Sequence, residues 1–271
     1  MASGTGIAHV RSGWDGFLHI LRRRHFSPFK TYVNREHRTV VVLNPKVGTK
    51  TFRQALTDGM RELKGVTDPS DGRYWFLKKA REFQFARLRD YAHAFRYPGE
   101  YQFFCFVRNP YARLRSAWQN KFAYGHVQGY SRSIRRKELG RLRRFATAAK
   151  LPEAEQGAAI SFETFLAYVE SQRAGTRDHH WDDQVDVLLM DDIRYEQVFR
   201  MEGEFTAGMR QIFGRIGLSG PVMERILGTQ KNSSPKSEPP VYTAELAARV
   251  HRLYARDFAA FGYDEGSWRG L

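Results

Sequence analysis

The sequence predicts an α/β protein built on a parallel β-sheet, and three observations indicate this fold class. The chain has 271 residues, of which 42% are hydrophobic and 14% aromatic, enough for a sizeable core. Short apolar runs that suit buried strands alternate with segments of helical spacing, as in a parallel sheet flanked by helices. Two of these runs pass through a tight turn directly into a helix. We expect a single domain over residues 1–271.

The first strand–turn–helix unit begins with "VVVLNPKVGTKTF". The β-branched run Val40–Leu43 predicts a buried strand, and Asn-Pro ends it. From Thr51 onward, apolar residues recur at helical spacing, which predicts a helix. The residues with this spacing are Phe52, Leu56, Met60 and Leu63.

The second unit begins with "FFCFVRNPYARLRSAW". A helix predicted over residues 75–95 leads to the strand Gln102–Val107. Asn109 then suits the N-cap position of the next helix, and Pro110 its first turn. Both units therefore present a turn at the carboxyl end of a predicted strand.

The second half of the chain continues the alternation. Ser161 caps a predicted helix in "SFETFLAYVESQ", and "IRYEQVF" suits a short strand. "KNSSPKSEPP" is a predicted loop. The last predicted helix begins after Thr243 and ends at Gly262.

Composition narrows the class of partner. The net charge of +15 indicates an anionic partner such as nucleic acid, an acidic membrane surface, a polyanionic sugar or a phosphorylated small molecule. Cys105 is the one cysteine; it excludes a disulfide framework and suits a buried structural thiol. No Cys and His cluster has metal-ligand spacing, so we expect no metal site. The amphipathic stretch "FLHILRRR" suits a short surface helix, and a peripheral contact with acidic lipid is the alternative.

The turn after Leu43 has the features of an anion-binding loop. A helix that follows a strand through a tight turn directs backbone N–H groups at an anion. Gly48 permits close backbone approach, Thr49 and Thr51 offer hydroxyls, and Lys46 and Lys50 offer charge. The loop lacks the first glycine of the G-x-x-x-x-G-K pattern that holds nucleoside triphosphates with Mg²⁺. A phosphosulfate handled without metal suits it better, and a plain turn with surface lysines is the alternative.

The turn after Val107 provides a second set of anion ligands. Arg108 ends the strand, and Ser116 follows eight residues later, about two helical turns on. An arginine can hold a phosphate through two parallel hydrogen bonds, and a hydroxyl can add another. Because the carboxyl ends of parallel strands lie at the same edge of a sheet, one ligand with two anionic groups could contact both turns. The alternative is that Arg108 pairs with a carboxylate and Ser116 only packs.

The two motifs together resemble a known family. "NPKVGTKTF" resembles the 5′-phosphosulfate loop of sulfotransferases that use 3′-phosphoadenosine 5′-phosphosulfate (PAPS), and "FVRNPYARLRSAW" resembles their 3′-phosphate motif. "DHHWDDQ", "IRYEQVFRME", "KNSSPKS" and "VYTAELAARVHRLYARDFAAFGY" resemble further segments of the carbohydrate, chondroitin-type (family 2) branch. The resemblance covers residues 38–264, and residues 1–35 form an N-terminal extension without a match.

The resemblance implies a fold, a reaction and a set of site residues. The fold is a P-loop-like parallel sheet of about five strands flanked by helices. The reaction moves a sulfuryl group from PAPS to an acceptor hydroxyl, or an amine, and leaves adenosine 3′,5′-bisphosphate. Lys46 is the implied catalytic lysine. The implied PAPS-binding residues are Lys46, Gly48, Thr49, Lys50, Thr51, Phe52, Arg108, Ser116, Asn232, Ser233 and Ser234.

The sequence departs from its lumenal relatives in two respects. Many members have Ser or Thr where Lys50 stands, and lumenal members carry cysteines where this chain reads "LLMDD". With no predicted signal peptide or membrane span, we expect a cytoplasmic, bacterial protein.

Sulfuryl transfer also needs a base near the acceptor oxygen. His93, on the segment before the second motif, is one candidate, and His180 in "DHHWDDQ" is another, with His179 and Glu202 behind them. For each histidine a structural or surface role is the alternative.

Residues 128–150 form a strongly basic stretch that suits either a flap for an anionic acceptor, such as a glycan or glycolipid, or a solvated helix face. Two other functions stay open. One is a small-molecule kinase, but this chain lacks the phosphate-loop pattern expected of such kinases. The other is a non-catalytic nucleotide or nucleic-acid binder. A nucleic-acid binder would interleave aromatic residues with its basic ones, and the run from Arg132 to Arg144 has none, so we expect no nucleic-acid partner.

Overall fold

A computed structural model of the chain describes residues 13–27, 30–66, 68, 70, 88–123, 132–151, 159–218, 220–228 and 241–271. The chain forms two compact units. The first, the sheet unit, consists of Met1–Arg108 and Gln184–Lys236, and the second, the helical unit, consists of Asn109–Asp183 and Ser237–Leu271. The expectation of a single domain stays a prediction, since compactness does not tell whether either unit folds alone.

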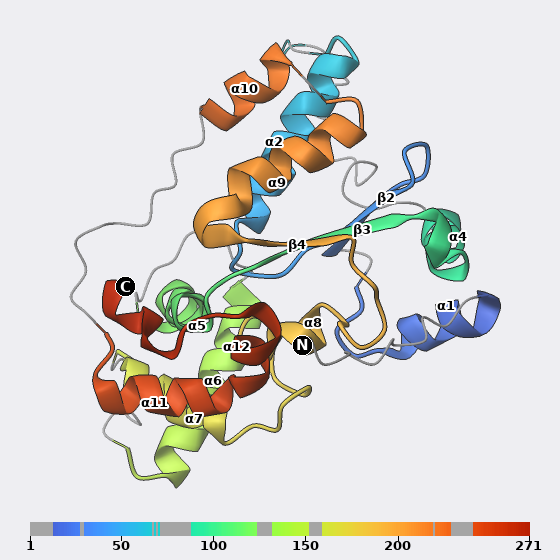
Figure 1. Cartoon of the computed structure of the whole chain (residues 1–271). Helices are drawn as coiled ribbons and strands as arrows, with labels where there is room; N and C mark the ends of the chain where they lie inside the picture. Colours follow the sequence, from blue (N-terminus) through green and yellow to red (C-terminus); the bar gives the residue numbers. More distant parts are fainter. Residues whose placement is uncertain are drawn as a thin grey trace, which may run out of the picture. The chain divides into compact units, whose positions relative to one another are not determined.

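The sheet unit is built on a four-stranded sheet in the order β1-β2-β3-β4 (Figure 1). The strands are β1 Thr31–Asn34, β2 Thr39–Val42, β3 Gln102–Val107 and β4 Gln197–Arg200. The last three strands are parallel, with Val41 opposite Phe104, while β1 is antiparallel to β2. The α/β class and the mainly parallel sheet are as predicted.

Three of the four observed strands are predicted from the sequence, one of them with its observed bounds. Gln102–Val107 is predicted with its observed bounds, and the strand expected at Val40–Leu43 is β2, one residue earlier. The strand in "IRYEQVF" begins only at Gln197. The described sheet has four strands rather than about five, and its first strand, β1, is not predicted. β1 has only four residues and joins β2 through a charged turn without glycine, so it carries little local signal.

Helices pack on both faces of this sheet. The face that carries Val41, Phe104 and Phe106 packs against α2, α9 and α10, which forms the main core of the unit (Figure 1). On the other face, Phe103 contacts Phe95 of α4. Cys105 is fully buried in β3, as expected of a structural thiol, and burial raises the pKa of the thiol well above its usual value. The helices of the unit are α1 Gly13–Arg22, α2 Thr49–Leu63, α4 Leu88–Arg96, α8 Gln184–Val187, α9 Met201–Arg215 and α10 Pro221–Gly228.

Helix α9 packs so closely on the sheet that Gly208 has no room for a side chain. A β-carbon at this position would lie 2.6 Å from the Phe199 ring and 2.8 Å from the Phe106 ring. In an open helical position, replacing glycine with alanine stabilises the helix by up to about 1 kcal/mol. At Gly208 the steric conflict with two buried rings outweighs that gain.

We therefore expect Gly208→Ala to lower the free energy of unfolding by about 1–3 kcal/mol, the usual cost of overpacking a core. Gly203→Ala is the matched control in the same helix, because a β-carbon there meets nothing within 4 Å. Urea denaturation of both variants measures the difference. Equal effects of the same sign would contradict the packing described above.

The helical unit consists of α5 Pro110–Trp118, the π-turn Gln119–Ala123, α6 Arg132–Ala148, α7 Phe162–Glu170, α11 Ala244–Leu253, α12 Ala255–Phe261 and the 3₁₀-helix Glu265–Gly270. All three predicted caps are present. The side chain of Asn109 accepts hydrogen bonds from Tyr111 and Ala112, that of Ser161 from Thr164, and that of Thr243 from Leu246.

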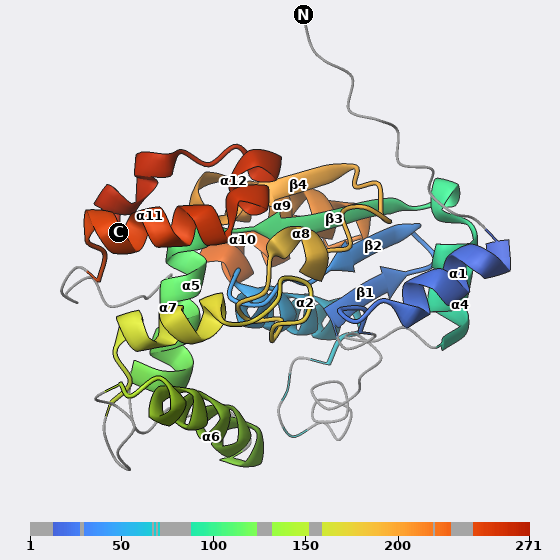
Figure 2. The same ribbon diagram turned by 90° about the horizontal axis from the view of Figure 1, so that it is seen from below.

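The last predicted helix is in fact two helices, α11 and α12, separated at Tyr254. The Tyr254 hydroxyl donates to the carbonyl oxygen of Trp181 at 2.6 Å. The chain ends this helix at Gly262, as predicted, with the glycine in the left-handed region. Figure 2 shows α11 and α12 next to each other in the C-terminal segment.

Two predicted segments lie partly or wholly outside the described residues. The helix expected over 75–95 is described only as α4, Leu88–Arg96. The loop at 231–240 lies outside them altogether. Among the helices that the structure describes, none combines the length and the apolar character needed to cross a lipid bilayer.

Candidate anion-binding site

The candidate site lies where β2 and β3 end, at the same edge of the sheet. The two strands are parallel and in register, so the turns that follow them are neighbours. Arg108 comes directly after β3, and its Nη1 donates a hydrogen bond to the carbonyl oxygen of Lys46 at 3.1 Å. The structure thus brings Arg108 next to residues 43–51, here called the lysine loop, although the sequence placed the two at separate turns.

A buried glutamine, Gln184, holds the two turns together. Its Oε1 accepts hydrogen bonds from the backbone N–H of Arg108 at 3.0 Å and from Nδ2 of Asn44 at 2.8 Å. Its Nε2 donates to the carbonyl oxygen of Arg108 at 2.8 Å. Both Gln184 and Asn44 are completely buried. Sequence reasoning missed this function for both residues, although Gln184 ends the "DHHWDDQ" segment quoted above.

The backbone of the lysine loop is shaped to bind an anion. Lys46 has φ 71° and Gly48 has φ 74°, which turns the chain sharply before α2. Helix α2 begins after Gly48, which has no side chain to cap it. The N–H groups of its first turn, together with the positive end of the helix dipole, therefore point to an anionic ligand.

Gly48 is required for two independent reasons. Its positive φ is unfavourable for residues with a side chain. A β-carbon would also lie 2.6 Å from the ring of Phe205 in α9. The loop therefore rests directly on the aromatic core.

Thr49, Lys50 and Thr51 differ in their exposure and in the contacts of their side chains. The Thr49 hydroxyl donates to the carbonyl oxygen of Asn44 at 2.7 Å, so its proton serves the loop itself. Lys50 is exposed and Thr51 half-buried, both in the first turn of α2.

The prediction that Phe52 binds the nucleotide needs correction. Its side chain is 1% exposed and packs against Phe106 and Phe213 in the core, with ring centroids 6.2 and 5.3 Å away. Its backbone N–H donates to the carbonyl oxygen of Gly48. Phe52 anchors the start of α2 and presents no group to a ligand.

His93 lies at the opposite edge of the sheet. Its Nδ1 is 3.3 Å from Nη1 of Arg38 and 3.0 Å from the Tyr101 hydroxyl. Arg38 and Tyr101 immediately precede β2 and β3, whereas Lys46 and Arg108 follow them. At about 3.3 Å per strand residue, the two edges are about 20 Å apart. This placement argues against His93 as the base for a reaction at the lysine loop.

A cavity of about 820 Å³ also lies at this amino edge of the sheet unit. Its lining includes Ile20, Tyr97, Tyr101 and Tyr195. None of the residues of the lysine loop borders it, so we do not assign the anionic ligand to it.

The remaining predicted ligands fall outside the sheet unit or outside the described residues. Ser116 lies half-buried in α5 of the helical unit. Asn232, Ser233 and Ser234 lie outside the described residues. Their assignment to the nucleotide stays a prediction.

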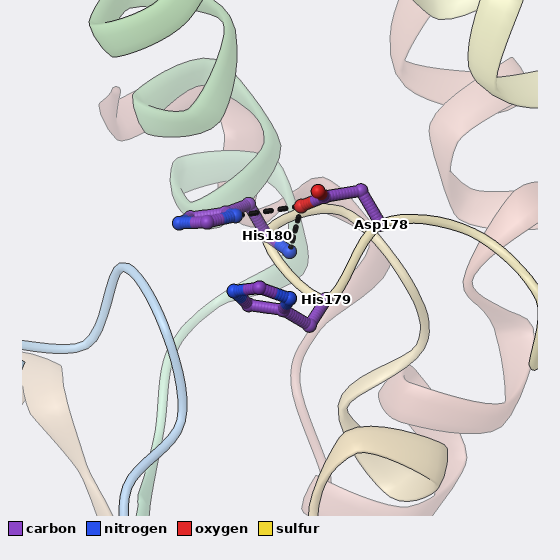
Figure 3. Close-up of side chains that lie close together, drawn as sticks. All are labelled: Asp178, His179 and His180. Carbon is purple, nitrogen blue, oxygen red and sulfur yellow. Dashed lines mark hydrogen bonds and ion pairs between the residues drawn. The ribbon is translucent and has the colours of Figure 1, made fainter. Parts of the chain in front are cut away.

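In the helical unit, His180 forms a close pair with Asp178 (Figure 3). Nδ1 of His180 is 2.6 Å from Oδ1 of Asp178, which also accepts the backbone N–H of His180 at 2.9 Å. The ring of His179 lies beside that of His180, with centroids 4.2 Å apart (Figure 3). The Lys121 ammonium lies 3.6 Å from the Asp178 carboxylate. A cation bound by Asp178, His179 and His180 would be opposed by this ammonium group.

Several charges determine the ionisation of these groups. Burial disfavours the Asp178 carboxylate, but the hydrogen bond and charge of His180, together with Lys121, outweigh it and hold the pKa of Asp178 well below its usual value. Burial lowers the pKa of Lys121, partly offset by the charge of Asp178. Asp178 is therefore ionised at neutral pH and fixes the orientation of the His180 ring.

This pair predicts a change in stability with pH. A carboxylate with a lowered folded-state pKa contributes stability above its unfolded pKa of about 4, and this contribution is lost as the pH falls through the folded-state pKa. Asp178→Asn should therefore be less stable than the natural protein at pH 7, and the difference should shrink below pH 4. Urea midpoints at pH 7 and pH 3 measure it. A difference of the same size at both pH values would contradict the assignment.

A buried arginine supports the same segment from α5. Arg113 is 2% exposed; its Nη1 donates to the carbonyl oxygen of Asp182 at 2.7 Å and its Nη2 to that of His179 at 2.9 Å. Burial lowers the pKa of Arg113, while the nearby charges of Asp257, Asp183 and Asp182 act in the opposite direction. Arg113 therefore fixes the backbone on both sides of His180.

A mainly parallel sheet with helices on both faces and a glycine-led helix after a strand is the α/β class of fold that is common among nucleotide-binding proteins. Within that class, the chain belongs to the sulfotransferase family, whose model matches residues 30–264.

Two curated relatives are similar to this chain. Both are named "Carbohydrate sulfotransferase 11"; the one from Rattus norvegicus is 25% identical and the one from Mus musculus 28% identical over 169 residues. Each match covers 60% of this chain and 47% of the relative, so the chain matches about half the length of these relatives. No solved structure matches the chain significantly.

Proposed function

We propose that this protein is a PAPS-dependent sulfotransferase that transfers a sulfuryl group to a carbohydrate hydroxyl. The hydrogen bond from Arg108 to the Lys46 carbonyl carries the proposal, because it joins the two turns whose sequences resemble the 5′-phosphosulfate and 3′-phosphate motifs. Membership of the sulfotransferase family supports the donor, and the names of the two relatives support a carbohydrate acceptor.

The residues present suit the donor chemically. Residues 43–52 contain two lysines and no acidic residue, and the helix dipole of α2 has its positive end at this loop. Lys46, Gly48, Lys50 and Thr51 would hold the 5′-phosphosulfate, and Arg108 and Ser116 the 3′-phosphate. Lys46 would neutralise the leaving phosphate where Mg²⁺ acts in nucleoside-triphosphate loops, and we therefore expect transfer to persist in EDTA.

In the proposed reaction, the acceptor oxygen forms a bond to sulfur while the bond from sulfur to the bridging phosphate oxygen breaks. Adenosine 3′,5′-bisphosphate leaves, with its new negative charge opposite Lys46. The acceptor proton passes to a base, for which we propose His180. Because Nδ1 of His180 faces Asp178, Nε2 is the nitrogen that would accept the proton.

The basic helix α6 supports an anionic acceptor such as an acidic glycan or glycolipid. Lys137, Arg141 and Arg144 are all exposed at a spacing of four and three residues, so they share one face of the helix. Replacing arginines of this face with glutamine would raise the KM for the acceptor and leave PAPS affinity unchanged.

The kinase and nucleic-acid alternatives are not favoured, because the chain belongs to the sulfotransferase family.

Two measurements test the proposal. Adenosine 3′,5′-bisphosphate should raise the melting temperature of the full chain well above the effect of ADP, because only the former carries a 3′-phosphate for Arg108. Arg108→Gln should remove this preference. Label from ³⁵S-PAPS should then appear on a member of a carbohydrate panel. Equal shifts with both nucleotides, or a preference for ADP, would overturn the proposed donor.

A further inference from the structure

Helix α1 of the sheet unit carries an exposed apolar strip that the proposed reaction does not use. Trp14 is 56% exposed, Leu18 41% and Leu21 39%. At about 100° per residue, these three side chains lie within about 60° of one another around the helix. We refer to Trp14, Leu18 and Leu21 as the α1 strip.

The α1 strip is not needed to attach the helix to the unit. The other face of α1 is buried through Phe17 and Ile20. His19 and Arg23 both pair with Asp192, at 2.7 Å each. Figures 1 and 2 both show α1 alongside α4 at one end of the sheet. These contacts hold the helix without Leu18 and Leu21, which are directed to solvent.

Arginines border the α1 strip at the end of the helix and from α4. Arg22 and Arg24 are exposed at the end of the helix, next to Leu21. From α4, the guanidinium of Arg96 lies over the Trp14 ring, 4.0 Å from its centroid, and 5.2 Å from that of Tyr97, which is itself exposed. Asp15 is the one acidic residue of α1.

We propose that the α1 strip is a membrane-contact surface that binds bilayers rich in anionic lipid. Exposed Trp and Leu on one helical face with arginines at its border is the arrangement by which helices lie in the interface between lipid headgroups and acyl chains. Trp suits that depth because its ring is apolar and its N–H can remain hydrated. The arginines are complementary to phosphatidylserine and similar headgroups.

The geometry requires contact with one leaflet only. Ten residues at 1.5 Å each make α1 about 15 Å long, half the roughly 30 Å of a bilayer's hydrocarbon core. Helix α1 lies at the edge of the sheet where the parallel strands begin. It packs against α4, and α4 contacts the turn that precedes β3. A bilayer bound by α1 would therefore leave the lysine loop, at the carboxyl edge, facing away from the lipid.

Vesicle sedimentation of the full chain tests the proposal. The protein should sediment with vesicles that contain about one-third phosphatidylserine and remain in the supernatant with phosphatidylcholine alone. Leu18→Gln/Leu21→Gln should weaken binding by more than about tenfold. Arg22→Glu/Arg24→Glu should weaken it by roughly thirtyfold, at about fivefold for each arginine removed. Emission from Trp14 should shift to the blue on binding, and this shift should be absent in Trp14→Ala.

Two matched controls make the result specific. Leu63→Gln removes a similarly exposed leucine from α2, and Arg215→Glu/Arg252→Glu makes the same change of charge at two exposed arginines of α9 and α11. Both variants should bind vesicles like the natural protein. Equal binding to neutral and anionic vesicles, or an Arg215→Glu/Arg252→Glu variant as weak as the α1 variants, would overturn the proposal. So would α1 variants that change the oligomeric state of the free protein, since the strip would then be a contact between copies.

Discussion

Replacing Lys46 with methionine should lower kcat for sulfuryl transfer by about 10²–10³-fold, the usual loss when one group that stabilises transition-state charge is removed. The ammonium group of Lys46 is proposed to neutralise the leaving phosphate, whose charge develops only as the bond to sulfur breaks. Methionine keeps a long side chain and the same β-carbon, so the backbone strain at φ 71° is unchanged. The effect should therefore appear in kcat, with binding of adenosine 3′,5′-bisphosphate reduced much less.

The control for this variant is Lys64→Met at the other end of α2, where the lysine is exposed. It removes the same charge at the residue that follows α2 and should leave kcat unchanged. Steady-state rates with labelled PAPS and direct titration of the bisphosphate separate the two effects. A Lys46→Met enzyme with the natural kcat would exclude the lysine from the chemistry.

Replacing Arg113 with methionine should lower the free energy of unfolding by about 3–5 kcal/mol, the cost of breaking a buried charge network by removing one partner. Arg113 is buried and donates to the carbonyl oxygens of His179 and Asp182. Without it, both carbonyls lose a donor, and the fully buried carboxylates of Asp182 and Asp257 lose a compensating charge. We also expect activity to fall, because these carbonyls fix the segment that carries His180.

Arg210→Met provides the comparison at the surface. Arg210 pairs with Glu224 through two hydrogen bonds of 2.9 and 2.8 Å, but both side chains are half or more exposed. Water solvates the partner that remains, so little change in stability is expected. Urea denaturation of the two variants tests whether burial, rather than the number of hydrogen bonds, determines the cost.

Local signals explain which parts of the structure were predictable. The caps at Asn109, Ser161 and Thr243 are correct because a capping side chain bonds to N–H groups two or three residues away. The strand Gln102–Val107 is correct because it is apolar on both faces, as a central parallel strand must be. In contrast, β1 is short and lies at the edge of the sheet, where pairing with β2 rather than its own composition defines it.

The less predictable features depend on contacts between distant residues. Gln184 joins Asn44 to Arg108 from far along the chain, and no local pattern marks a glutamine for that role. Phe52 stands within a ligand motif yet packs into the core, because it lies on the same face of α2 as Ala55 and Leu56, three and four residues later, and this face packs on the sheet. His93 precedes the second motif in sequence, but the intervening strand places it at the far edge.

Because the ring of Phe205 lies directly against Gly48, the lysine loop packs on the hydrophobic core without an intervening layer. A substitution that enlarges or empties the interior around this ring would alter the shape presented to the nucleotide without touching it. Screens for thermostable variants that repack α9 should therefore monitor donor affinity at every round, since improved melting and impaired catalysis can arise from the same methyl group.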